Sequence, residues 1–128
     1  MERPFRHLDV EQRGEVFCAR VRNNRLLADV EVHQLAAELL ELVKDRGCRK
    51  LALSLGPEPL QCLYSVFLAK LVTLRRVLEE NGGAMKLCEV HPETFGVFKA
   101  CRLHEHFDFV PDLSTAVATL EQSSGGTP

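Results

Sequence analysis

The stretch that most constrains the fold runs from Leu60 to Gly83, because it carries the longest helical repeat in the chain. At about 100° per residue, its large apolar side chains fall on one side of a helix. The members of this side are Leu63, Phe67, Leu71, Leu74 and Leu78, with Leu68 and Val72 on its flank. Such a wide apolar arc predicts a helix over residues 60–81 that lies against a sheet. The helix is expected to end at the turn signal Asn81-Gly82-Gly83.

The opposite side of this predicted helix is small and lightly charged in its first half. Its members are Ser65, Ala69, Thr73, Arg76 and Glu80. Ser65 lies near the start of the helix and is expected to face water or a partner. A serine in the first turns of a helix often forms only local hydrogen bonds, so the pattern alone leaves a regulatory role open.

Length and composition indicate an ordinary globular protein. The chain has 128 residues, 45% of them apolar and 27% charged, which suits one domain over residues 1–122 and a flexible tail at 123–128. A formal net charge of −2 gives no basic surface and argues against nucleic-acid binding. No apolar run is long enough to span a bilayer and the N-terminus has no hydrophobic signal core, so we expect a cytoplasmic protein. The five scattered cysteines include no CxxC pair and are expected to be free thiols.

Turn signals and periodicity divide the whole chain into alternating strands and helices. The expected strands are 4–10, 15–22, 49–55, 84–90 and 107–110; besides 60–81, the expected helices follow an N-cap at Asp29, open at His91-Pro92-Glu93 and span 113–120. Strands that alternate with helices imply crossover connections and a mostly parallel sheet. The fold class is therefore α/β, with a mixed sheet of about five strands and, through right-handed crossovers, the main helices on one face.

Sequence motifs give little support to an enzyme. The chain has no GxGxxG, P-loop, GxSxG or HExxH motif. Cys88 with His91, and Cys101 with His104, are residue types that bind zinc, but their spacing matches no zinc finger, so no metal and no cofactor is expected. Cys62 lies near the start of the predicted helix, which could lower its pKa, but no histidine is adjacent in sequence to act as a base. A metal- or thiol-dependent enzyme remains a minor alternative.

The order and spacing of these elements over Phe5 to Leu120 resemble a STAS domain, the module of bacterial anti-sigma-factor antagonists. The segments that carry the resemblance are the leading hairpin, the LALSL strand with the helix after it, the NGGAMKLC turn and strand, Pro92-Glu93, and FKACRLHEHF. In that family an Asp-Ser-x-Gly-Leu motif carries a serine that is phosphorylated by the partner, an anti-sigma factor that is also a kinase. Counted back from the glycine pair, the motif falls on residues 64–68, where Ser65 and Leu68 match. Tyr64 replaces the aspartate and Phe67 the glycine.

The resemblance implies a non-enzymatic regulatory protein that binds an anti-sigma factor or kinase-type partner through the N-terminal end of helix 60–81, here called the front of the helix. Ser65 is the candidate phosphoacceptor. The candidate partner contacts are Leu60, Cys62, Tyr64, Ala69 and Thr73. The replacements at Tyr64 and Phe67 favour an alternative, a degenerate STAS module that binds a partner or small ligand without phosphorylation. Both hypotheses leave the oligomeric state open.

Overall fold

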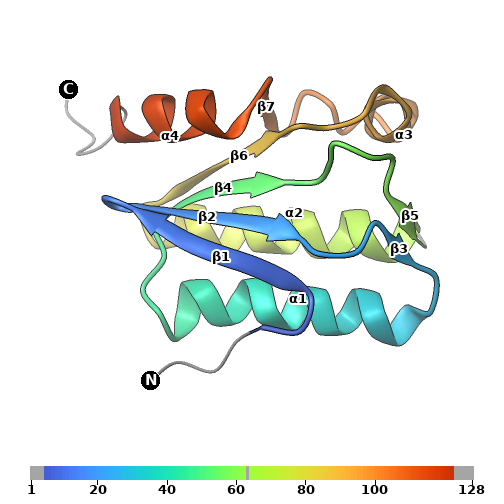
Figure 1. Ribbon diagram of the computed structural model, residues 1–128, viewed down its shortest axis with the longest axis horizontal. Coiled ribbons are helices and arrows are strands. Elements are labelled where there is room, and N and C mark those ends of the chain that lie inside the picture. The colour runs from blue at the N-terminus through green and yellow to red at the C-terminus, as the bar shows by residue number, and fades with distance from the viewer. Residues whose placement is uncertain (1–4, 63, 123–128) are drawn as a thin grey trace.

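The computed structural model describes residues 5–62 and 64–122 (Figure 1), so the expected tail at 123–128 lies outside the described residues. At its centre is a five-stranded sheet with the strand order β1-β2-β4-β6-β7. Its strands are β1 (Leu8–Arg13), β2 (Val16–Val21), β4 (Lys50–Ser54), β6 (Ala84–Cys88) and β7 (Asp108–Val110). β1 pairs with β2 in the antiparallel sense, and every other pair is parallel. The predicted mixed, mostly parallel sheet is confirmed.

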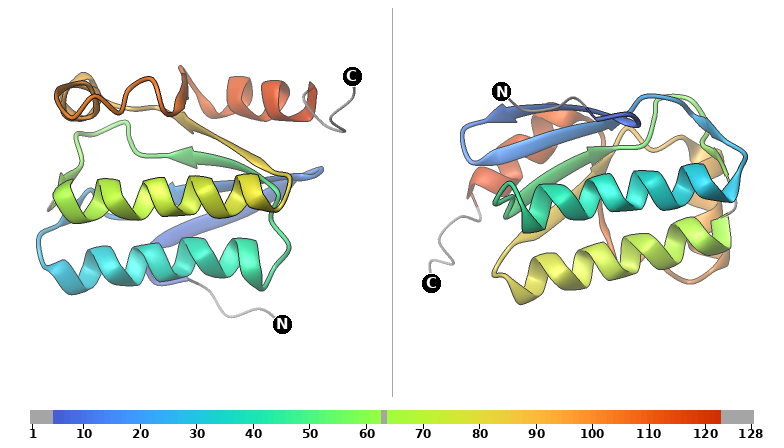
Figure 2. Two further views of the ribbon diagram at one scale, coloured as in Figure 1. Left: turned by 180° about the vertical axis from the view of Figure 1, so that it is seen from behind. Right: turned by 90° about the horizontal axis from the view of Figure 1, so that it is seen from below.

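Two long helices, α1 (Asp29–Lys44) and α2 (Tyr64–Glu80), lie side by side on one face of the sheet (Figure 2). The strands that follow them add in one direction, so right-handed crossovers bring both helices to the same face, as expected. α1 begins one residue earlier than expected, with Ala28 as its N-cap instead of Asp29. The side chain of Glu31 accepts a hydrogen bond from the Ala28 N–H at 3.2 Å, which satisfies this first backbone donor without a capping side chain.

The two shorter helices lie elsewhere. α3 (Pro92–Ala100) follows β6 and opens as predicted, with His91 as its N-cap and Pro92 at its first position. α4 (Leu113–Gln122) covers the opposite face of the sheet from α1 and α2 (Figure 1).

The apolar interior consists of two cores, one on each side of the sheet. Side chains alternate along β4, so Leu51 and Leu53 lie on the face that α1 and α2 cover, whereas Ala52 lies on the face that α4 covers. The core under α4 is made of Val16, Cys18, Ala52, Cys88, Ala116 and Leu120. The core under α1 and α2 is the larger one, and it fixes the position of α2.

The predicted start of the central helix is wrong. α2 begins at Tyr64 and not at Leu60, because residues Gln61–Cys62 form β5, a two-residue strand that pairs in parallel with β3 (Arg25–Leu26). The expected apolar side of the helix is otherwise buried at Phe67, Leu71, Leu74 and Leu78, while Leu63 lies outside the described residues. Val72, expected on the flank of the core, is 41% exposed. Within the described part of the chain, no helix is long and apolar enough to cross a membrane.

Candidate functional site

The front of α2 is reached through a segment whose backbone is held by side chains from other elements. The Leu60 N–H donates a hydrogen bond to the Thr94 hydroxyl of α3 at 3.1 Å, and Thr94 is 1% exposed. The Leu60 carbonyl accepts a hydrogen bond from the Tyr64 hydroxyl, so a side chain of α2 holds the other backbone group of the same residue. Burial raises the pKa of Tyr64, and a hydrogen bond between its side chain and Thr94 acts in the opposite direction. Leu60 and Thr94 are buried and Tyr64 is partly buried, and the three residues form one contact at the start of the helix.

A second anchor comes from the connection between β2 and β3. The Gln61 N–H donates to the Asn24 carbonyl at 2.7 Å, and the Asn24 side-chain amide donates to the Pro59 carbonyl at 3.1 Å. With β3 paired to β5, these bonds satisfy the backbone of a segment that belongs to neither the main sheet nor a helix. The path of the chain into α2 is therefore determined from two sides.

Ser65 is the second residue of α2, and its side chain is exposed. The first turn of the helix contains no acidic residue, so its own side chains do not offset the partial positive charge of the free N–H groups there. An anion on Ser65 would lie next to those groups. Phosphorylation of Ser65 stays a prediction.

The other candidate contacts differ in how much surface they offer. Leu60 is only 3% exposed, so its side chain belongs to the core and does not form part of the surface that was predicted for it. Cys62, Tyr64 and Thr73 are partly buried, and Ala69 is exposed. The Thr73 hydroxyl donates to the Ala69 carbonyl one turn earlier at 3.1 Å, which is a local bond within the helix.

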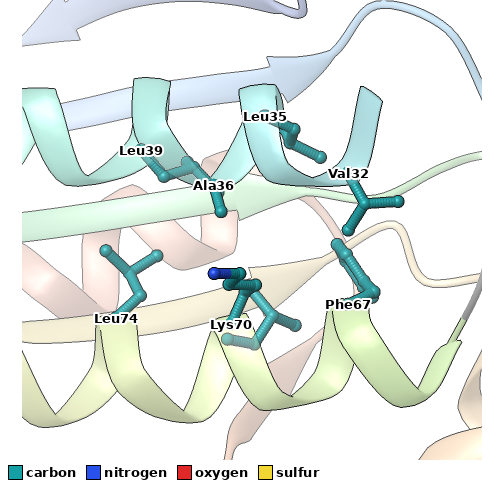
Figure 3. A pocket seen from close by; sticks show the side chains of 8 residues that line it. Val32, Leu35, Ala36, Leu39, Phe67, Lys70 and Leu74 are labelled. Carbon is teal, nitrogen blue, oxygen red and sulfur yellow. The ribbon is translucent and has the colours of Figure 1, made fainter. Parts of the chain in front are cut away.

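Phe67 fills the seam between α1 and α2. Its side chain is 2% exposed, and its ring meets the Tyr64 ring edge to face at a centroid distance of 6.3 Å. Figure 3 shows Phe67 and Leu74 from α2 facing Val32 and Leu39 from α1. The cavity left between the two helices measures about 10 Å³, room for roughly one water molecule. This seam does not offer the space that a small organic ligand needs.

The metal and thiol alternatives gain nothing from the structure. Among the described residues, no three His, Cys, Asp or Glu side chains gather where they could hold a metal ion. Cys88 is buried under α4, and the His91 Nδ1 accepts the Glu93 N–H at 3.0 Å as the cap of α3. Burial raises the pKa of Cys62 to about 12, whereas a thiol nucleophile needs a lowered pKa, so the position near the helix start does not activate this thiol.

A polar network near the same end of the sheet has no counterpart in the sequence analysis. Ser54, at the end of β4, is fully buried and donates to Glu89 Oε1 at 2.5 Å, and Arg20 Nη2 donates to the same oxygen at 2.9 Å. The network joins the carboxyl ends of β2, β4 and β6. The sequence signal for Ser54 is only that it alternates with the leucines of the LALSL strand. Thr94 gives no signal because its partner, Leu60, is 34 residues away.

No family model matches the sequence, and no curated protein does, whereas 21 chains of solved structures match. An anti-sigma-factor antagonist (STAS) domain protein from Planctomyces limnophilus is 22% identical, with a TM-score of 0.76 over 89% of this chain and 97% of that chain. A serine-to-glutamate variant of RsbS from Moorella thermoacetica is 15% identical, with a TM-score of 0.72 over 90% and 95%. Phosphorylated SpoIIAA, a Bacillus cell fate determinant, is 18% identical, with a TM-score of 0.64 over 88% and 97%. At these identities the likeness is one of fold, and the fold of this chain is that of a STAS domain.

Proposed function

We propose that this protein is a non-enzymatic regulatory binding protein that docks an anti-sigma factor or kinase-type partner in the cytoplasm through the front of α2. The observation that carries the proposal is the exposed Ser65 in the first turn of a helix whose back is buried on the sheet. The fold supports it, because the neighbours by fold are anti-sigma-factor antagonists and one of them is in a phosphorylated form. In this proposal Ser65 is the phosphoacceptor.

The physical basis of such a switch is electrostatic. Phosphate adds roughly −1.5 to −2 charges at neutral pH. Within the domain this charge is tolerated, because it lies beside the free N–H groups of α2. Against a partner that offers no cation, the same charge loses its hydration without compensation and opposes docking. The unmodified surface around Ser65 and Ala69 is small and lightly charged, and the unmodified protein is the form that binds.

The test compares Ser65→Ala and Ser65→Asp in affinity for an anti-sigma-factor kinase from the same genome. We expect Ser65→Ala to bind like the unmodified protein and Ser65→Asp to bind at least about tenfold more weakly, a loss of ~1.4 kcal/mol. Ser114→Asp is a matched control, since Ser114 is likewise the exposed second residue of a helix, α4 on the opposite face. Incubation with the kinase and ATP, followed by mass spectrometry, should map phosphate to Ser65. Phosphate found only at other residues would remove the switch and leave the docking proposal.

A second candidate function is constitutive binding without phosphorylation. Tyr64 and Phe67 favour it, because the two replaced positions of the family motif are used for other purposes: the Tyr64 hydroxyl holds the Leu60 carbonyl, and Phe67 fills the helix seam. Equal partner affinities for Ser65→Ala and Ser65→Asp would support this candidate over the first.

A further inference from the structure

We propose that Thr94 of α3 is a positioning residue for the front of α2, which it holds through Leu60. The functional meaning of this inference rests on the proposed docking at that surface, but the positioning itself does not. Thr94 was not among the residues expected to contribute to the site, and it lies on a different helix from Ser65.

The geometry of Leu60 is the basis of the inference. Its N–H is bonded to Thr94 and its carbonyl to Tyr64, so α3 and α2 hold the two backbone groups of one residue. Tyr64 is the first residue of α2 and directly precedes Ser65. A displacement of Leu60 therefore acts on the first turn of α2 within four residues of chain.

Burial makes the hydroxyl of Thr94 necessary at this position. Thr94 and Leu60 are 1% and 3% exposed, so water does not replace the bond between them when the hydroxyl is removed. Valine has nearly the same shape as threonine but cannot accept the hydrogen bond, and it would leave the Leu60 N–H unpaired. Serine keeps the acceptor and loses only a methyl group.

The consequence concerns local order and not the fold as a whole. The segment between β4 and α2 is otherwise held by Asn24, through bonds to Pro59 and Gln61, and by the Tyr64 hydroxyl on the Leu60 carbonyl. Loss of the Thr94 bond removes the contact with α3, so we expect the chain at Leu60 and Gln61 to open more often while the main sheet stays closed. A front of α2 that opens more often presents the Ser65 surface in its docking conformation for a smaller fraction of the time.

The experiment measures amide hydrogen exchange in the full chain for Thr94→Val and Thr94→Ser. For Thr94→Val we expect exchange at the bonded amides of Leu60 and Gln61 to be at least about tenfold faster, with a smaller change at the sheet amides of Leu53 and Leu87. Thr94→Ser should restore most of the protection. Thr119→Val is a matched control, because the Thr119 hydroxyl donates to the Thr115 and Ala116 carbonyls of its own helix, α4. Equal acceleration at all amides, or none at Leu60, would overturn the inference.

Two further measurements separate the inference from the proposed function. Tyr64→Phe removes the other bond to Leu60 and should increase exchange over the same residues, which keeps the inference testable if Thr94→Val does not fold; unchanged exchange would contradict it. Affinity for the kinase partner forms the functional arm, in which Thr94→Val should bind more weakly and Thr94→Ser like the parent. If the parent protein binds no such partner, the proposed function fails, and the hydrogen-exchange result still decides on Thr94.

Discussion

At the scale of single residues, Phe67 has the most consequence for how the site can work. It is the fourth residue of α2, and its ring is buried between the two long helices and against Tyr64. A glycine there, as in the family motif, would free backbone for close approach but leave a void in the seam. This chain has the packed alternative, so the proposed docking would use the exposed side of α2 at Ser65 and Ala69 and not the backbone at position 67.

Replacing Phe67 by alanine tests this structural role. We expect Phe67→Ala to lower the free energy of unfolding by about 3–5 kcal/mol, because the apolar area and the packing against α1 are lost together. Val72→Ala is the control on the same helix: Val72 is 41% exposed, and its truncation should change stability by no more than ~0.5 kcal/mol. Urea denaturation followed by circular dichroism measures both. A loss below 1 kcal/mol for Phe67→Ala would mean that the seam closes without it.

Helical periodicity predicted which residues of α2 are buried, but not what lies before the helix. The angle per residue correctly buries Phe67, Leu71, Leu74 and Leu78. The same angle also placed Val72 on the flank of the buried side, because a helical wheel carries no information about how much of the apolar arc the rest of the protein covers. The bond between Leu60 and Thr94 joins residues 34 apart, and no local pattern reports such a bond.

At the scale of elements, the turn after α2 shows how closely the helix end approaches the sheet. The Gly83 N–H closes the helix by donating to the Leu78 carbonyl at 2.8 Å, and Gly82 has a φ of 77°. A Cβ atom on Gly83 would lie 2.1 Å from the Arg49 carbonyl oxygen, just before β4. The turn signal in the sequence therefore marked the end of α2 correctly, whereas its start was misplaced because the apolar period continues through the residues of β5.

Two glycine substitutions distinguish this contact from a general effect of glycine. We expect Gly83→Ala to destabilise the protein by roughly 1–3 kcal/mol, because the added methyl group forces the Arg49 backbone away. Gly96→Ala, inside α3 with nothing within 4 Å of the added atom, should stabilise it by ~0.4–1 kcal/mol. Thermal unfolding of the two variants beside the parent gives both signs. Equal effects of the two substitutions would show that the turn can move without cost.

At the scale of the whole molecule, the sheet separates two cores, and the sequence anticipated only one of them. In the LALSL strand Leu51, Leu53 and Leu55 alternate with Ala52 and Ser54, which predicts one heavily packed face and one lighter face. Leu51 and Leu53 lie in the larger core. The alternation does not say what covers the lighter face, against which Ala116 and Leu120 of α4 are fully buried. The short final helix was predicted, but the face that it covers depends on the direction of the chain after β7, about which periodicity carries no information.

Burial of thiols in both cores makes the stability of the whole molecule sensitive to alkaline pH. Burial raises the pKa of Cys48, in the larger core, and of Cys88, in the core under α4, from the ordinary value of 9.0 to about 12. Between these values the unfolded chain releases thiol protons that the folded chain retains. The free energy of unfolding therefore falls as the pH rises from 9 to 12, by at most ~1.4 kcal/mol per pH unit for each thiol. Below about pH 8, where both the folded and the unfolded chain keep these thiols protonated, they add almost no pH dependence.

Denaturation at pH 8, 9.5 and 10.5 should show this fall and identify its source. Cys48→Ala and Cys88→Ala each remove one buried thiol, so each variant should lose stability less steeply with pH than the parent, although both start from a lower value at pH 8. Cys101→Ala, at the exposed end of α3, should keep the parent slope. Identical slopes for all four proteins would contradict a thiol origin.

At pH 8 a thiol reagent should modify Cys101 in the folded protein and reach Cys48 and Cys88 only after unfolding, because a buried neutral thiol is neither accessible nor nucleophilic.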